Sequence, residues 1–331
     1  MKKLNWLITG GLGFVGRTLI AELLKQDLAQ AIRVVDNFST GSPSDLQPVT
    51  DFSLVTLDNI SAMSAHSGIE VVKADIRDAE PAVKVTAGAD VIIHLAANTG
   101  VQPSIESPRL DMESNVMGTL NYLEAARQNQ IKQFVLASSG APIGEAEPPI
   151  TEKSPCRPIS PYGASKLAGE AYCSAYNGSF GINTIVLRFS NVYGPLSGKK
   201  GSVVAKFIKQ ALAGETWTIN GNGEQTRDFI YSQDLAKAVV KAAYHPKGGE
   251  IFQVATQEET SVRELADLLS AQIKEVFELE VTIDYGEPLI GDVARNFADI
   301  THSKQVLGWQ PEVKLATGIV DTLNWFREKN K

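Results

Sequence analysis

Short apolar segments alternate with longer amphipathic stretches through the first 190 residues of the chain. The apolar segments cover residues 4–9, 32–36, 71–73, 91–95, 133–137 and 184–188. Between them, apolar positions recur at helical spacing, as in residues 15–24 and at Val116, Leu120 and Leu123. Strands that alternate with helices predict right-handed βαβ crossovers. We therefore expect an α/β fold with a doubly wound parallel sheet that is buried on both faces.

The pattern weakens in other parts of the chain. Residues 50–68 lack clear periodicity, which predicts a short hairpin or a loop excursion. Residues 142–161 are rich in proline and are expected to form a loop, because proline fits neither a central strand nor a helix interior. After about residue 195 the pattern changes to mixed elements. We predict a Rossmann domain over residues 1–190, with returning segments near 225–255, and a smaller mixed α/β lobe over 191–331 packed against it.

Composition and charge narrow the function classes. Of the 331 residues, 43% are hydrophobic and 21% are charged, as in an ordinary soluble globular protein. The net charge of -7 argues against a nucleic-acid partner, because phosphate backbones require a concentrated basic face. The N-terminal apolar run is short and ends in glycines, which predicts a strand and not a signal peptide. No segment reaches the roughly 18 to 20 apolar residues of a membrane span, so no membrane partner is expected.

Cysteine and histidine usage adds two expectations. The two cysteines, Cys156 and Cys173, are too few for a disulfide framework and are typical of a reducing compartment, so we expect a cytoplasmic protein. The four histidines are scattered along the chain without ligand spacing, and we predict no metal site.

A glycine-rich turn follows the first predicted strand. Glycines at positions 10, 13 and 16 allow a sharp turn that brings backbone amides close to a pyrophosphate at a helix N-terminus. Such a turn alone is a weak signal, since many glycine clusters only make tight turns. Asp36, twenty residues after Gly16, ends the next strand and can accept hydrogen bonds from ribose hydroxyls, although it could also simply start a turn. No arginine follows it within residues 37–40, which favours NAD over NADP.

Tyr162 and Lys166 form the candidate catalytic pair. Their four-residue spacing places the phenol and the ammonium on one face of a helix. A free tyrosine titrates near ~10, and a nearby ammonium favours the phenolate and lowers that pKa. Ser138 and Ser139 end the preceding predicted strand. The alternative interpretation is a solvated helix pair without chemistry.

Several motifs together resemble the extended short-chain dehydrogenase/reductase family, and within it the NAD-dependent sugar-nucleotide epimerases and dehydratases. They are the two-residue spacing of the glycines, Ala74-Asp75-Ile76, His94-Leu95-Ala96-Ala97, Asn115 and the three stretches 161–166, 188–195 and 227–230. The resemblance runs from Gly10 to about Trp309.

The resemblance implies a set of site residues. The implied catalytic residues are Ser139, Tyr162 and Lys166. The implied NAD-binding residues are Gly10, Gly13, Phe14, Val15, Gly16, Asp36, Asn37, Ser39, Asp75, Ile76, Leu95, Ala96, Ala97, Asn115, Ser138, Tyr162 and Lys166. The implied substrate-binding residues are Ser139, Asn191, Arg227, Arg295 and Asn296, with Asn191 and Arg227 at a nucleotide-sugar diphosphate. A homodimer is also implied, with residues 115–127 and the helix after Tyr162 at its interface.

The residues after Ser139 bear on the type of reaction. The 4,6-dehydratases of the family carry an acidic pair there, where this chain has Gly140 and Ala141. Without a general acid and base, water elimination is not expected. The resemblance therefore implies a nucleotide-sugar 4-epimerase acting through a transient 4-keto sugar. Two alternatives stay open: an NAD-dependent dehydrogenase or reductase of a sugar or sugar acid, and a cofactor-sensing protein without chemistry.

The chain departs from the family pattern at four places. Pro142-Ile143 replaces a Val-Tyr pair near the sugar. Asn220 replaces an aromatic residue that contacts uracil, and Leu289 replaces a second diphosphate arginine. Either Arg295 and Trp217 compensate, which we prefer, or the substrate is not a standard UDP-sugar. Asn296 is smaller than the tyrosine of glucose-restricted epimerases, so an N-acetyl group is expected to fit.

Overall fold

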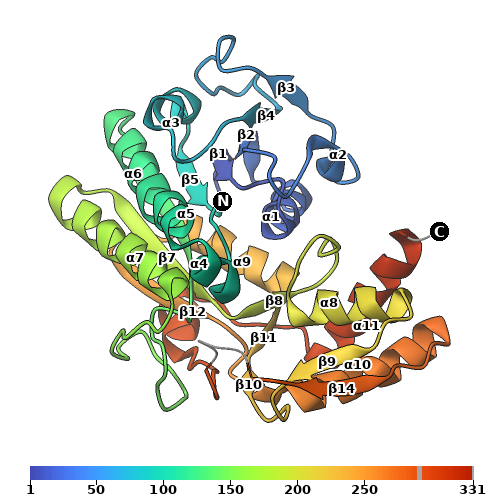
Figure 1. Ribbon diagram of the computed structural model, residues 1–331. Helices are drawn as coiled ribbons and strands as arrows, with labels where there is room; N and C mark the ends of the chain where they lie inside the picture. The colour runs from blue at the N-terminus through green and yellow to red at the C-terminus, as the bar shows by residue number, and fades with distance from the viewer. Residues whose placement is uncertain (289–292, 330–331) are drawn as a thin grey trace.

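The computed structural model describes residues 1–288 and 293–329, and within them a large parallel sheet forms the centre of the molecule (Figure 1). All eight strands are parallel to their neighbours. In spatial order they are β12 (Glu250–Val254), β7 (Asn183–Phe189), β6 (Gln133–Ser139), β5 (Val91–His94), β1 (Leu4–Thr9), β2 (Ala29–Asp36), β4 (Ile69–Lys73) and β3 (Ser53–Val55). The doubly wound α/β fold predicted from the sequence is confirmed.

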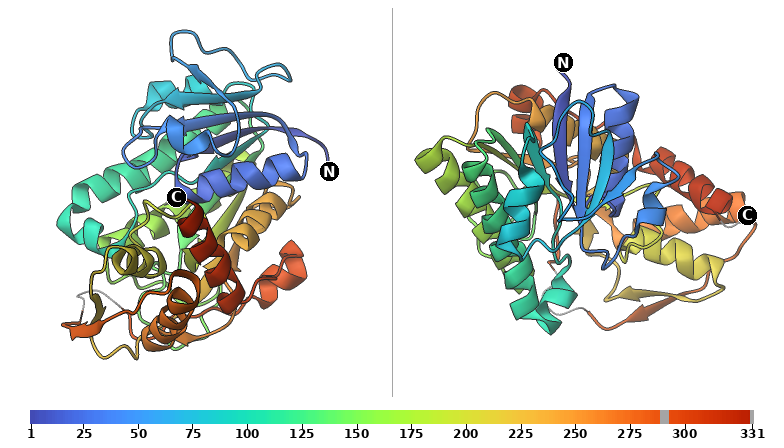
Figure 2. Two further views of the ribbon diagram at one scale, coloured as in Figure 1. Left: turned by 90° about the vertical axis from the view of Figure 1, so that its right-hand side faces the viewer. Right: turned by 90° about the horizontal axis from the view of Figure 1, so that it is seen from above.

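Helices cover both faces of this sheet. On one face pack α1 (Phe14–Lys25) and α9 (Ser232–Ala243), and on the other α3 (Ala79–Thr86), α6 (Gly118–Gln128) and α7 (Pro161–Phe180) (Figures 1 and 2). Neighbouring residues in a strand point to opposite faces, so Leu7 joins one core cluster and Ile8 the other. This two-sided burial explains why the strands read as short, continuous apolar runs.

Of the two alternatives predicted for residues 50–68, the structure shows the excursion and no hairpin. The excursion contains β3, and β3 adds to the edge of the sheet parallel to β4. Leu54 pairs with Val71 there, yet its side chain is 66% exposed. An edge strand that buries so little has no alternating pattern for the sequence to display.

The helix that carries the candidate catalytic pair has strong start and stop signals. Ser160 is the N-cap of α7, and its hydroxyl accepts a hydrogen bond from the Gly163 amide at 3.1 Å. Pro161 occupies the first turn, where its missing N–H costs nothing. Gly181 ends the helix with a φ of 65°, the left-handed conformation that glycine adopts without strain. Tyr162 is thereby held at the first turn, directly beyond the proline-rich loop.

A second lobe lies against the carboxyl ends of the sheet strands (Figure 1). Within the described residues it contains paired strands: β8 (Asn191–Tyr193) with β11 (Phe229–Tyr231), β9 (Trp217–Asn220) with β14 (Ile283–Gly286), and β10 (Thr226–Arg227) with β13 (Thr260–Ser261). Its helices α8 (Val203–Leu212), α10 (Val262–Phe277) and α11 (Leu315–Lys329) share one apolar core with these strands.

Short helical segments complete the described structure. They are α2 (Pro43–Leu46), α4 (Val101–Glu106), α5 (Pro108–Met112) and the π-helical turns η1 (Glu113–Met117) and η2 (Ser303–Leu307). None of the helices in the described ranges is long and apolar enough to cross a lipid bilayer.

Candidate active site

The turn between β1 and α1 forms a cradle of backbone atoms that has no room for side chains at its glycine positions. Gly10 has a φ of 65°, and a Cβ there would lie 2.8 Å from the Ala96 backbone. A Cβ on Gly16 would lie 2.4 Å from the Cα of Gly11. Gly13 is the N-cap of α1 and has no side chain to cover the first amides of the helix. The turn therefore leaves the positive end of α1 open to a pyrophosphate, as the dinucleotide prediction requires.

Gly16→Ala is expected to reduce dinucleotide binding sharply. The new methyl group forces the glycine turn to move, which costs about 1–3 kcal/mol and displaces the amides of the cradle. The measurement is the amount of NAD released per chain when the purified protein is denatured. Gly178→Ala on α7 is the matched control, because a Cβ there meets no atom within 4 Å. Full NAD occupancy in Gly16→Ala would contradict this role for the turn.

Polar residues gather at the ends of β2 and β4, where an adenosine would lie. The Asp36 carboxylate accepts hydrogen bonds from the amides of Leu12 (3.2 Å) and Phe38 (2.9 Å), and burial raises its pKa. Asp75 accepts hydrogen bonds from Arg77 and from Asn37 Nδ2 (3.1 Å), and the Arg77 guanidinium holds the pKa of that carboxyl well below its usual range. Asp36 is therefore held in place by backbone donors. Its oxygens retain lone pairs for ribose hydroxyls.

The other residues predicted at this end occupy the surrounding framework. Ser39 is exposed and its amide donates to Asn37 Oδ1. Ile76 is buried, and a Cβ on Gly118 would lie 2.7 Å from its Cδ1. Phe14 is buried in the first turn of α1.

Asn115 is bonded to the protein on all sides. Its Oδ1 accepts from the Asn98 amide at 2.8 Å, and its Nδ2 lies within 3.0 Å of Asn98 O, Asp111 Oδ1 and Ser165 Oγ. It is 2% exposed and is not among the residues that line the cavity described below. The structure thus places Asn115 beneath the chain that follows β5, where it positions that segment. Its predicted contact with NAD remains a prediction.

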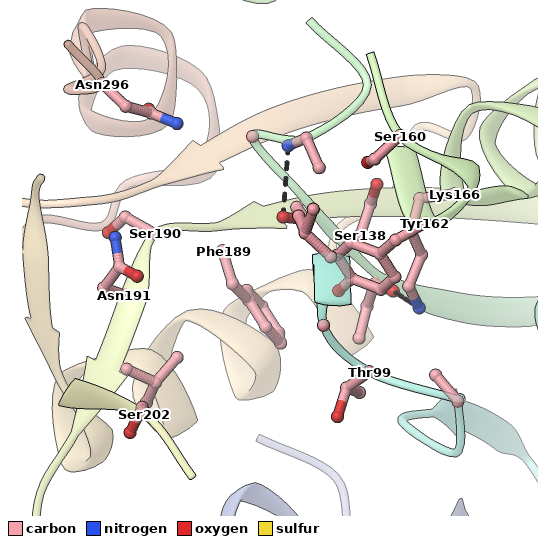
Figure 3. A pocket seen from close by; sticks show the side chains of 18 of the residues that line it. Thr99, Ser138, Ser160, Tyr162, Lys166, Phe189, Ser190, Asn191, Ser202 and Asn296 are labelled. Carbon is pink, nitrogen blue, oxygen red and sulfur yellow. Dashed lines mark hydrogen bonds between the residues drawn. The ribbon is translucent and has the colours of Figure 1, made fainter. Parts of the chain in front are cut away.

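The three residues predicted to be catalytic lie together. Ser139 interacts with the Tyr162 side chain and acts to lower its pKa, and Lys166 Nζ lies 5.9 Å from the centre of the Tyr162 ring. Figure 3 shows Tyr162 and Lys166 next to each other. Lys166 Nζ also donates to the carbonyl of Ala137 at 2.9 Å. The Tyr162 amide donates to Ser104 Oγ in α4 at 3.0 Å, a contact that the sequence did not predict. The backbone of Tyr162 is therefore held in place by α4.

Burial controls the protonation of both groups. It raises the pKa of Tyr162 to about 12, against a smaller opposite effect of the Ser139 hydrogen bond. It lowers the pKa of Lys166 to about 8, although the carboxylates of Asp111 and Glu170 act in the opposite direction. At neutral pH the lysine is mostly charged and the tyrosine is neutral. A further positive charge beside the phenol would favour the phenolate.

A buried ion pair supports the end of β6. The Arg188 guanidinium binds the Glu170 carboxylate through Nε at 3.0 Å and Nη2 at 2.7 Å, and both side chains are at most 3% exposed. Ser138 Oγ donates to the same carboxylate at 2.5 Å. Sequence reasoning missed Glu170, although its position four residues after Lys166 on the same helix face was a usable signal. Ser138 is therefore tied to α7, next to the predicted catalytic residue Ser139.

A cavity of about 670 Å³ opens at the carboxyl ends of the strands, as expected for an open parallel sheet. Of the predicted cofactor residues, those that line it are Val15, Leu95, Ala97, Ser138, Tyr162 and Lys166. Of the predicted substrate residues, those that line it are Ser139, Asn191, Arg227 and Asn296. Figure 3 shows Tyr162 and Lys166 on one side, Asn191 and Asn296 on the other, and Phe189 between them.

The structure does not bring Arg295 to this cavity. Its guanidinium forms ion pairs with Glu259 (2.8 Å) and Glu147 (3.0 Å), and it is absent from the cavity lining. The hydrogen bond to the Glu259 carboxylate is the largest cause of the raised pKa of Arg295. Arg295 therefore lies apart from the other predicted substrate residues, all of which line the cavity, and its predicted contact with substrate stays a prediction.

The compensation predicted for Trp217 is wrong. Its ring is fully buried, stacks on Phe207 with 4.5 Å between centroids, and donates Nε1–H to Phe207 O at 2.8 Å. A ring enclosed in this core cannot stack on a nucleotide base. Asn220 ends β9 outside the described cavity lining, and Leu289 lies outside the described residues.

Comparisons with known proteins confirm the family that the motifs predict. A family model described as "NAD dependent epimerase/dehydratase family" matches residues 6–255. A UDP-glucose 4-epimerase of Mycolicibacterium smegmatis is 36% identical over 330 residues, covering 98% of this chain and 99% of that protein. The solved UDP-glucose 4-epimerase of Thermotoga maritima, bound to UDP-glucose, has a TM-score of 0.86 at 30% identity and covers 99% of this chain and 100% of that one. A UDP-N-acetylglucosamine 4-epimerase of Methanobrevibacter ruminantium has a TM-score of 0.86 at 29% identity, over 99% and 100% of the chains.

Proposed function

The chain belongs to the NAD-dependent epimerase/dehydratase family, and from this premise we propose that it is a nucleotide-sugar 4-epimerase. NAD is its cofactor, in keeping with the family and with the cradle formed by Gly10, Gly13 and Gly16. The observation that carries the proposal is that Ser139, Tyr162 and Lys166 line the wall of one large cavity, with Lys166 Nζ 5.9 Å from the centre of the Tyr162 ring. We further propose that residues 1–190, with 225–255, hold the cofactor, and that residues 191–331 mainly hold the substrate.

The chain's own residues move one proton and hold the sugar. Ser139 orients the C4 hydroxyl by hydrogen bonding, and Tyr162 takes its proton as the C4–H bond breaks. When bound, NAD supplies the acceptor for that hydride and later returns it. The resulting 4-keto sugar turns over within the cavity and presents its other face to the cofactor. Tyr162 then gives the proton back, so no second substrate is consumed.

Epimerisation is favoured over water elimination by the wall beside Ser139. Gly140 and Ala141 line the cavity there, and the described lining contains no aspartate or glutamate. Glu147, in the proline-rich loop, is 86% exposed and paired with Arg295. Elimination of water would lack both a general acid and a general base.

Lys166→Met is expected to shift the acidic limb of the pH–rate profile upward. Removing the ammonium, which lies 5.9 Å from the centre of the phenol ring, is expected to raise the pKa of Tyr162 further, because a nearby positive charge favours the phenolate. The rate should therefore fall at neutral pH and recover in part as pH increases. The measurement is kcat/KM as a function of pH, with Lys166→Arg as the control that keeps a charge. An unchanged acidic limb with uniformly lower activity would contradict this electrostatic role.

The proposed function is tested with a panel of UDP-, GDP- and dTDP-sugars followed by NMR of the products. We expect a product of unchanged mass that is inverted at C4, with no NADH accumulating in solution. NADH that accumulates in step with product would instead support the NAD-dependent dehydrogenase. Absence of turnover with every sugar nucleotide, despite bound NAD, would support a cofactor-sensing protein.

We propose that the sugar pocket accepts an N-acetyl group. Asn296 lines the cavity opposite Gly140, where a Cβ would lie 3.3 Å from the Asn296 amide nitrogen. The Asn296 amide therefore packs against Gly140, and the longer side chain of a tyrosine at position 296 would extend into cavity space that the asparagine leaves open. Comparable rates with UDP-glucose and UDP-N-acetylglucosamine are expected, and Asn296→Tyr should reduce only the second. Activity on UDP-glucose without activity on UDP-N-acetylglucosamine would refute the proposal.

We also propose a homodimer that forms through α4–α7. These helices expose large apolar side chains that a monomer would leave in water, including Ile105, Leu110, Met112, Met117 and Phe180. Light scattering on the purified protein should give twice the chain mass, and a monomer mass would refute the proposal.

We also propose a cytoplasmic, reducing location, because Cys156 and Cys173 are both free thiols.

A further inference from the structure

The charged side chains that line the active-site cavity in the described structure are all positive. Four cationic residues, Lys166, Lys199, Lys200 and Arg227, line it. Among the lining residues that the structure describes, none is acidic. Lys166 belongs to the catalytic pair and Lys199 forms an ion pair with Asp45 at 2.6 Å. Lys200 is left as a cation of the cavity whose role neither the sequence analysis nor the proposed mechanism explains.

Lys200 is directed into the cavity. It lies between β8 and α8 and lines the same cavity as Tyr162 and Asn191. Its charge acts on Lys166 across the cavity, where it contributes to lowering the pKa of that residue. Burial alone lowers the pKa of Lys200, and no carboxylate of the described chain opposes the shift. A partly buried ammonium without a counter-ion is unfavourable, which an anionic ligand would correct.

The backbone around Lys200 is held on both sides. Arg17 Nη2, in α1, donates to Leu196 O at 2.8 Å, and Lys199 is tied to Asp45 in α2. Lys209 Nζ, in α8, donates to the carbonyl of Lys200 itself at 2.9 Å. The segment therefore connects the cofactor domain to the second lobe, and it positions Lys200 before any ligand binds.

We propose that Lys200 binds the diphosphate group of a nucleotide in this cavity. An ammonium forms strong, charge-assisted hydrogen bonds with phosphate oxygens. The contact would supply the positive charge missing at Leu289, which Arg295 does not provide because it is paired with two glutamates. Ser202 lines the cavity as the N-cap of α8, so the positive end of that helix opens on the same space. Two ligands carry a diphosphate, NAD and the nucleotide sugar, and the identity of the second rests on the proposed function.

The test compares Lys200→Met, which removes the charge, with Lys200→Arg, which keeps it. Lys206→Met is the matched control, since Lys206 is an exposed residue of α8 and does not line the cavity. UDP, dTDP and GDP, each beside its monophosphate, are titrated by calorimetry into the NAD-loaded proteins. NAD⁺ affinity is measured separately. Thermal unfolding verifies that each variant is folded.

The expected result is a roughly tenfold to hundredfold weaker affinity of Lys200→Met for one diphosphate ligand. Affinity for the monophosphates should change far less, Lys200→Arg should recover most of the loss, and Lys206→Met should bind normally. Weaker nucleoside diphosphate binding assigns the contact to the substrate, and weaker NAD⁺ binding assigns it to the cofactor. Unchanged affinity for NAD⁺ and for all three nucleoside diphosphates would overturn the inference. Because binding is measured without turnover, a failed epimerase assay would refute the proposed function and leave this result intact.

Discussion

Tyr162→Phe is expected to lower the turnover rate by about 10²–10⁴-fold while leaving NAD bound. The substitution removes one oxygen atom, the only group of Tyr162 that can take and return the C4 hydroxyl proton. The ring keeps its place because the Tyr162 amide is bonded to Ser104 and the helix is capped by Ser160. The measurement is the single-turnover rate with saturating sugar nucleotide, beside the NAD content of the purified variant.

Tyr172→Phe provides the matched control for this prediction. Tyr172 lies on the same helix, is 38% exposed and does not line the cavity, so loss of its hydroxyl should leave the rate unchanged. Ser139→Ala should reduce the rate less than Tyr162→Phe does, because it removes the orienting partner and leaves the proton acceptor. A Tyr162→Phe enzyme that retained more than about a tenth of the activity would exclude Tyr162 as the general base.

Arg188→Met is expected to destabilise the protein by about 3–5 kcal/mol. The substitution leaves the Glu170 carboxylate buried, with its side chain 3% exposed and without its cationic partner. Ser138 shares that carboxylate, so the end of β6 beside Ser139 should be disturbed as well. The free energy of unfolding, measured by urea denaturation, gives the stability change, and the rate reports the disturbance at Ser139.

The double variant Arg188→Met/Glu170→Met shows how much of the lost stability comes from the unpaired charge and how much from changed packing. If the unpaired carboxylate causes the loss, removing both charges should restore a large part of the stability. A double variant that is less stable than Arg188→Met by the full cost of a second core substitution would show that packing dominates.

Local patterns were enough to predict the main sheet and the placing of Tyr162 and Lys166 side by side. Each β-strand buried on both faces shows as a continuous apolar run, and the spacing of Tyr162 and Lys166 follows from helix geometry alone. The edge strand β3 could not be predicted in this way. Its residues are largely exposed to solvent, so they show no clear pattern of apolar positions.

The substrate side of the cavity depended on contacts between distant segments. Arg295 is removed from the cavity by Glu259 and Glu147, which lie 36 and 148 positions away in sequence. Trp217 was expected to compensate for a missing contact with the nucleotide base. Its ring is instead buried in the core of the second lobe, where it stacks on Phe207. Lys200 is brought to the cavity by a segment anchored on α1 and α2. No periodicity or spacing encodes such placements, since each depends on how the second lobe folds against the first.

The outermost strand of the main sheet, β12, has a consequence for how the chain folds. β12 pairs with β7, yet residues 190–249 and much of the second lobe are synthesised between them. Helix α9, which comes just before β12, covers the same sheet face as α1. A ribosome-bound chain of about 190 residues therefore holds most of the sheet strands but exposes an apolar face that α9 will cover. The sheet is therefore complete only once β12 has been synthesised, so its folding depends on contacts between segments that lie far apart in the sequence.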